Sequence, residues 1–124
     1  MLRLYTHESC LRHDPCPGHA ESPLRLKAVL QALDADRFAT VDRVEAPRAS
    51  REQLLRVHDA AHVDRVLGSA PQEGRVQLDP DTWMSPGSDE AALRAAGATC
   101  AAVDAVLSGQ VPRAFCAVRP PGHH

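Results

Sequence analysis

The chain has 124 residues and 44% of them are hydrophobic, which is enough to fold around one modest core. Its formal net charge of -2 gives no reason to expect a nucleic acid or an anionic membrane as a partner, because both usually require a basic patch. No apolar run reaches the roughly 18 residues of a membrane span, and the amino terminus lacks the apolar stretch of a secretory signal, so we expect a cytoplasmic location.

The first half of the chain predicts two strands and three helices. Residues 2–5 suit a strand, and the loop that follows over residues 6–22 has the length and composition of loops that line a site. Residues 40–45 predict a second strand. Helix starts are expected at three places, marked by Ser22 before Pro23, by the capping box of Ser50 and Gln53, and by Asp59.

The second half predicts a surface loop, a long helix and a strand. Residues 68–88 are rich in Pro and Gly and predict an excursion on the surface. Residues 89–107 predict a helix packed on more than one side, because alanines fill most of the surface beside its apolar stripe. The stripe consists of Leu93, Ala96, Cys100, Val103 and Leu107. Residues 114–118 are a continuous apolar run, typical of a buried strand in a parallel sheet, so we expect one α/β domain over residues 1–124 with helices flanking that sheet.

The last six residues, 119–124, directly follow the predicted strand 114–118 and read Arg-Pro-Pro-Gly-His-His. Ligands of open parallel sheets bind beyond the carboxyl ends of the strands, so a site is expected here. The two prolines and Gly122 predict a turn that could direct both His123 and His124 into one pocket. Paired imidazoles suit proton transfer near neutral pH, although a solvated tail explains an isolated His-His pair more often.

This ending resembles the twin-histidine motif of the family that comprises histone deacetylases, acetylpolyamine amidohydrolases and acetoin-utilisation proteins. Three upstream segments resemble the same family in the correct order, namely residues 18–26, residues 58–63, and residues 78–82 with 85–88. Together the four segments are spread over most of the chain, from residue 18 to residue 124. The resemblance implies the amino-terminal portion of an arginase-deacetylase-like α/β fold.

The resemblance also implies an activity, the hydrolysis of an acetyl-amide such as N-acetyl-lysine or an acetylated polyamine. In the family, zinc polarises the carbonyl group and activates a water. Carried over by position, His123 would hold the water and stabilise charge, and His124 would be the general base and then the general acid. Gly122 and Arg25 would contribute to substrate binding. Of these, Arg25 matches an arginine of the inner channel below the zinc.

Two departures from the family pattern affect these expectations. Ala20 stands where the family usually has proline, which puts the contacts of the first loop in doubt. The zinc ligands of the family, an Asp-x-His pair and a later Asp, lie beyond the position of His124, so we expect no metal ligands in this chain. We therefore expect the 124-residue chain on its own to be inactive and incompletely folded.

A non-catalytic zinc-binding module is the alternative hypothesis. Cys10, His13, Cys16 and His19 fall at every third residue, and thiolates with imidazoles suit tetrahedral zinc. Structural zinc sites usually separate two pairs of ligands by a longer loop, so four ligands this close together favour a loop at the rim of a substrate site instead.

The remaining His and Cys residues have structural explanations. His58 and His62 are spaced like ligands on one helix face, but Asp59 begins a new helix between them, so packing or surface roles are expected. All four cysteines are expected to be reduced thiols, since no secretion signal is seen.

Overall fold

A computed structural model describes residues 1–122 of the chain. Its elements in chain order are β1 (Arg3–Thr6), η1 (Glu8–Leu11), α1 (Pro23–Ala32), η2 (Asp36–Phe38), β2 (Asp42–Glu45), α2 (Arg51–Leu55), α3 (Ala60–Gly68), β3 (Val76–Asp79), β4 (Thr82–Met84), α4 (Ser88–Leu107) and β5 (Ala114–Ala117). The short elements η1 and η2 are 3-10 helices. The predicted strands and helices are all present, with small differences at their ends.

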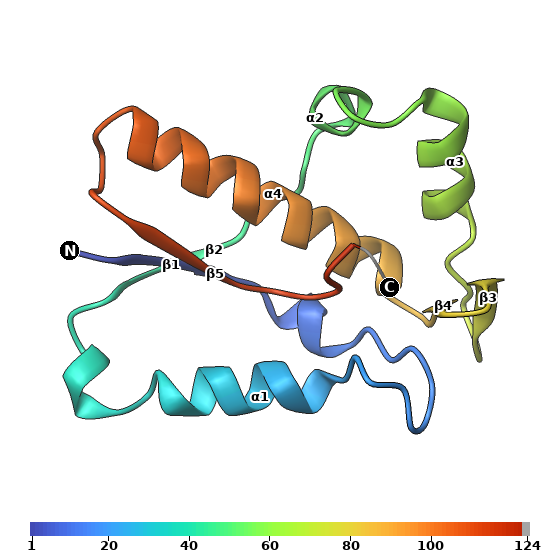
Figure 1. Cartoon of the computed structure of the whole chain (residues 1–124), viewed down its shortest axis with the longest axis horizontal. Helices are drawn as coiled ribbons and strands as arrows, with labels where there is room; N and C mark the ends of the chain where they lie inside the picture. Colours follow the sequence, from blue (N-terminus) through green and yellow to red (C-terminus); the bar gives the residue numbers. More distant parts are fainter. Residues whose placement is uncertain (123–124) are drawn as a thin grey trace.

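Strands β2, β1 and β5 form a parallel sheet with β1 in the centre. Helices α1 and α4 cover opposite faces of this sheet (Figure 1). Because successive residues of a strand point to opposite faces, Leu4 packs with Leu26 of α1, whereas Tyr5 packs with Ala98 and Ala102 of α4. This arrangement confirms the predicted α/β fold with a parallel sheet flanked by helices.

The predicted helix starts are confirmed by their hydrogen bonds. The side chain of Ser22 accepts the amide proton of Leu24, and that of Asp59 accepts the amide proton of His62. Ser50 and Gln53 form the expected reciprocal capping box at α2. These bonds satisfy amide groups that have no partner inside the first turn of a helix, so they define where each helix begins.

The predicted surface excursion over residues 68–88 is confirmed as far as residue 83, since none of these residues is buried, but the prediction missed a hairpin and is wrong near residue 88. Strands β3 and β4 pair as an antiparallel hairpin beside α3, and Met84, Ser85 and Ser88 are buried. Figure 1 shows the hairpin and α3 beyond one end of α4. The strands have only four and three residues, so they are too short for a clear alternating pattern to stand out among the prolines and glycines.

The predicted apolar stripe of α4 is also wrong over its second half. Val103 and Leu107 are 51% and 81% exposed, and the face that packs against the sheet consists of small residues instead. The buried positions are Ser88, Ala91, Ala95, Gly97, Ala98, Ala102 and Ala105. Small side chains let the helix lie close to neighbouring backbone, which explains the burial of the alanine face. Within residues 1–122, no helix combines the length and the apolar composition needed to cross a membrane.

Strand β5 lies at the edge of the described sheet, with β1 on one side. Phe115 on this strand is 46% exposed, whereas the sequence predicted a buried strand. The position of β5 nevertheless leaves its carboxyl end next to that of β1, because the two strands run parallel and in register from Arg3 with Ala114 to Thr6 with Ala117.

Candidate active site

The candidate site lies beyond the carboxyl ends of β1 and β5. The loop 7–22 leaves β1 at this edge, and residues 118–122 leave β5 beside it. Pro120 and Gly122 border a cavity of about 390 Å³ together with His13 from the loop. A cavity therefore lies at the exit of the last strand, where a site was expected, and the binding of a ligand there stays a prediction.

The walls of the cavity are mainly apolar. They come from α3, from the β3–β4 hairpin and from the first turns of α4, and they include Val63, Val66, Leu67, Leu78, Trp83, Met84 and Leu93. His58 and His62 also line it, with ring centroids 4.9 Å apart, and both residues are exposed, in agreement with the expected surface role. An apolar concave surface with a few polar groups is the usual form of a small-molecule site.

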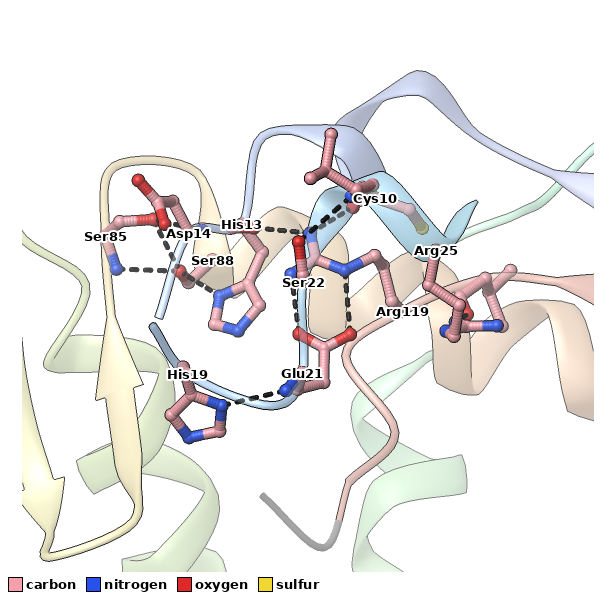
Figure 2. A network of polar contacts seen from close by, with 12 residues as sticks. Cys10, His13, Asp14, His19, Glu21, Ser22, Arg25, Ser85, Ser88 and Arg119 are labelled. Carbon is pink, nitrogen blue, oxygen red and sulfur yellow. Dashed lines mark hydrogen bonds and ion pairs between the residues drawn. The ribbon is translucent and has the colours of Figure 1, made fainter. Parts of the chain in front are cut away.

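Arg119 is the residue that joins the two segments of this edge. Its side chain is fully buried, and its Nε and Nη2 atoms donate to the two carboxylate oxygens of Glu21 at 2.8 and 2.6 Å. Its Nη1 atom donates to the carbonyl oxygen of Cys10 at 2.7 Å and to that of His13. Figure 2 shows the guanidinium group enclosed by these partners. Its peptide bond to Pro120 is cis.

The contacts of Arg119 were not predicted from the sequence, in which it stands as the first residue of the motif 119–124. One signal was available. An arginine directly after the apolar run 114–118 requires an acidic partner if its side chain is buried next to the sheet. Which acid pairs with it was not visible, because Glu21 lies 98 residues away in sequence.

His13 lies in a buried polar network between the loop and the start of α4. Its Nδ1 atom is 2.6 Å from the hydroxyl oxygen of Ser88, which also accepts the amide proton of Ser85 at 2.8 Å. The hydroxyl of Ser85 accepts the amide proton of Asp14 at 2.9 Å. Figure 2 shows this network beside the Arg119 cluster. The network holds the loop against the amino-terminal end of α4.

Burial and charge shift the pKa values of both acid–base groups at this edge. Burial lowers the pKa of the His13 imidazole, and the nearby charge of Arg119 lowers it further, while Glu21 and Asp14 partly oppose this effect. Burial raises the pKa of the Glu21 carboxyl, but the hydrogen bonds and charge of Arg119 outweigh it and the net pKa lies below its ordinary range. His13 is therefore neutral and Glu21 ionised at neutral pH.

Acidification is expected to lower the free energy of unfolding in two steps. The folded pKa of His13 lies below its ordinary value of 6.5, so the unfolded chain binds the proton first and stability falls as the pH drops below 6.5. The folded pKa of Glu21 lies below its ordinary value of 4.5, so a second loss begins as the pH drops below 4.5. Urea unfolding measured from about pH 8 to about pH 3 tests both steps.

A His13→Gln variant provides the control for the first step. Its stability is expected to vary less with pH between about pH 7 and 5.5 than that of the parent chain, because one group that titrates differently on unfolding is gone. An equal slope in the two proteins over this range would contradict the assignment to His13.

The predicted substrate-binding residues occupy different positions. Gly122 borders the cavity with a φ of 81°, a left-handed backbone conformation that favours glycine. Arg25 is exposed on α1, and its Nη2 atom donates to the carbonyl oxygen of Val118 at 2.9 Å. It supports the strand exit from outside the cavity, and its role in binding stays a prediction. His123 and His124, the predicted catalytic pair, lie outside the described residues.

Three of the four candidate ligands of the alternative zinc module have other partners or surroundings. His13 bonds Ser88, and His19 Nε2 lies 2.9 Å from the carbonyl oxygen of Asp81. Cys10 is buried, and burial raises the pKa of its thiol, which disfavours the thiolate that zinc requires. Over residues 1–122, no three His, Cys, Asp or Glu side chains are grouped to hold a metal ion. All four cysteines are free thiols, as expected.

Comparisons with known proteins identify the family. Residues 19–124 match the histone deacetylase domain model. The chain is 42% identical over 108 residues to a histone deacetylase-like amidohydrolase of Pseudomonas aeruginosa, covering 86% of this chain and 28% of that protein. It is 36% identical over 121 residues to a probable deacetylase of Archaeoglobus fulgidus, covering 95% of this chain and 33% of that protein.

A solved structure agrees with this result. The crystal structure of the HDA15 HD domain superposes with a TM-score of 0.88 at 28% sequence identity, covering 99% of this chain and 36% of that one. The chain therefore spans about a third of the length of the relatives it matches. The sequence and fold comparisons agree along almost the whole chain, which therefore belongs to the histone deacetylase family of hydrolases.

Proposed function

We propose that this chain forms part of a zinc-dependent deacetylase that hydrolyses the acetyl-amide bond of N-acetyl-lysine or of an acetylated polyamine. The main support is the position of Pro120 and Gly122, which border the cavity at the carboxyl edge of the sheet. The segment that matches the histone deacetylase domain includes both residues. Because the chain spans about a third of its relatives, the proposed activity is that of the complete family domain.

The cavity suits the aliphatic part of such a substrate. An acetylated lysine or polyamine presents a chain of methylene groups to the protein, and the side chains of Leu78, Trp83 and Met84 offer apolar surface along one wall. Ser88 and His13 add polar side chains to the lining, which also includes Gly122. The apolar side chains of the hairpin therefore support an alkyl chain bound along it.

Proton transfer in this proposal belongs to the twin histidines. His123 would hold the attacking water and stabilise the developing charge. His124 would accept the proton of that water as general base and would return it to the leaving amine as general acid. These roles rest on the resemblance of residues 119–124 to the family motif, since both histidines lie outside the described part of the chain.

Zinc would polarise the acetyl carbonyl group and activate the water. A catalytic zinc requires about three protein ligands and an open position. Residues 1–122 hold no such donor set, so they do not fit the metal by themselves. In this proposal the zinc ligands are supplied from outside the described residues.

A chimera tests the proposal. Residues 1–124 would replace the matching segment of the Pseudomonas aeruginosa amidohydrolase, and acetate release would be measured from an acetyl-lysine peptide and from an acetylated polyamine. We expect the chimera to hydrolyse at least one substrate, a chelator to abolish the activity, and the 124-residue chain on its own to be inactive.

Two variants of the chimera test whether its activity depends on the proposed general base. His124→Ala should lower kcat by about 100-fold or more, as expected for loss of a general base. Asp64→Asn, on the exposed face of α3, should leave kcat and KM unchanged. A folded, zinc-loaded chimera that hydrolyses neither substrate would contradict the proposed function.

A further inference from the structure

The Arg119–Glu21 pair differs from the other ion pairs of the described chain. Its two side chains are 0% and 7% exposed, whereas every other pair includes at least one side chain that is 20% exposed or more. Removing two charges from water is unfavourable unless their hydrogen bonds are well made. The burial of the Arg119–Glu21 pair therefore indicates a structural role that an exposed ion pair does not have.

All the hydrogen bonds of the Arg119 guanidinium go to one loop. Nε and Nη2 bind both oxygens of Glu21, and Nη1 binds the carbonyl oxygens of Cys10 and His13. A guanidinium group is planar and presents its donors in a fixed fork, so this set of partners restrains rotation as well as distance. Three points of the loop are thus held to the residue that precedes Pro120.

Both sides of this connection face the cavity. Pro120 and Gly122 border it immediately after Arg119, and His13, whose carbonyl group Arg119 binds, borders it from the loop. Arg119 itself is fully buried and does not line the cavity, so it does not reach a molecule bound there. Its effect on such a molecule must pass through the segments that it holds.

We propose that Arg119 and Glu21 are positioning residues that hold the segment 120–122 and the His13 side of the loop in register at the rim of the cavity. The inference rests on the proposed deacetylase function for its catalytic consequence, because residues 120–122 lead into the twin histidines. The mechanical part, the coupling of loop and strand exit, stands on the hydrogen bonds alone.

Amide hydrogen exchange on residues 1–124 within the chimera, where the rest of the domain is present, tests the coupling. Two amides report on the loop: that of Arg12 donates to the carbonyl oxygen of Ser9 at 3.0 Å, and that of Asp14 donates to the hydroxyl of Ser85 at 2.9 Å. A Glu21→Gln variant keeps the shape of the side chain but removes its charge. We expect its Arg12 and Asp14 amides to exchange about tenfold faster or more, a local opening.

The sheet provides the internal reference. The amide of Ala46, which donates to the carbonyl oxygen of Thr6 at 2.8 Å, should change by less than about twofold in Glu21→Gln. The matched control is Asp64→Asn, which removes the carboxylate from the exposed Arg51–Asp64 pair and should change none of the three amides. Unchanged loop amides, or an equal acceleration in loop and sheet, would overturn the proposal.

Arg119→Lys covers the case in which Glu21→Gln is too unstable to study. Lysine keeps the positive charge but lacks the planar set of guanidinium donors. The Arg12 and Asp14 amides should therefore again exchange faster, while the exchange rate of the Ala46 amide stays unchanged. In the chimera, Glu21→Gln should lower kcat by about tenfold with KM within about twofold, because alignment is lost while the cavity walls remain. If no chimera is active, the proposed function fails, and the exchange data still decide the coupling.

Discussion

Replacing Arg119 with methionine is expected to lower the free energy of unfolding by about 3–5 kcal/mol, the usual cost of breaking a buried ion pair by removing one partner. The carboxylate of Glu21 would remain in a site where its side chain is only 7% exposed. The carbonyl oxygens of Cys10 and His13 would also lose a charged donor. Urea unfolding at neutral pH, followed by circular dichroism, measures the change.

Two further variants separate this cause from a general effect of charge removal. Asp64→Asn breaks the exposed Arg51–Asp64 pair and should cost no more than about 1 kcal/mol. The double variant Arg119→Met with Glu21→Leu should recover part of the loss, since no unpaired charge stays buried. If Arg119→Met were as mild as Asp64→Asn, the buried pair would not stabilise this edge.

Replacing Gly97 with alanine is expected to cost at least about 3 kcal/mol, at the upper end of the range for overpacked cores. A Cβ atom at this position would lie 1.9 Å from the carbonyl oxygen of Pro47 and 2.6 Å from the amide nitrogen of Ala49. These are backbone atoms, so no side chain can rotate away to make room. Relief requires α4 to move from the segment after β2, which would disturb the packing of Ala98 and Ala102 on the sheet.

Gly68→Ala is the matched control for Gly97→Ala. Gly68 is also helical, at the end of α3, and an added Cβ would meet nothing within 4 Å. Alanine favours helix over glycine by up to about 1 kcal/mol, so this variant should be neutral or slightly stabilising. Equal stabilities of the two variants in urea unfolding would show that α4 does not lie as close to residues 47–49 as the structure has it.

Much of the fold could be predicted because the relevant interactions are local. Ser22, Ser50 and Asp59 were identified as helix caps, and each bonds an amide only two or three residues away. The apolar run 114–118 indicated a strand, which is β5, and a cavity lies at its exit, where a site was expected. The predicted catalytic histidines lie outside the described residues, so their roles depend on the resemblance and on the chimera.

The errors concern α4, which contacts distant segments, and the β3–β4 hairpin, whose strands are short neighbours in sequence. The sequence predicted a helix packed on more than one side, and the alanine side of α4 is buried, but Val103 and Leu107 of the stripe are exposed. At Gly97 the buried side lies against the backbone of residues 47–49, a contact between distant segments. The hairpin of β3 and β4 was missed because each strand is stabilised by the other and by its surroundings, and neither shows a pattern of its own.

The sequence by itself was thus enough to predict the helix starts, the alternation of strands and helices and the family resemblance. It also indicated at which edge of the sheet a site is expected. These features depend on capping bonds between near neighbours and on residue order, both of which can be read along the chain. The Arg119–Glu21 pair spans 98 positions. The Arg119–Glu21 pair forms only when the parallel sheet brings segments that are far apart in sequence close together in space. The same holds for the contacts that bury one face of α4.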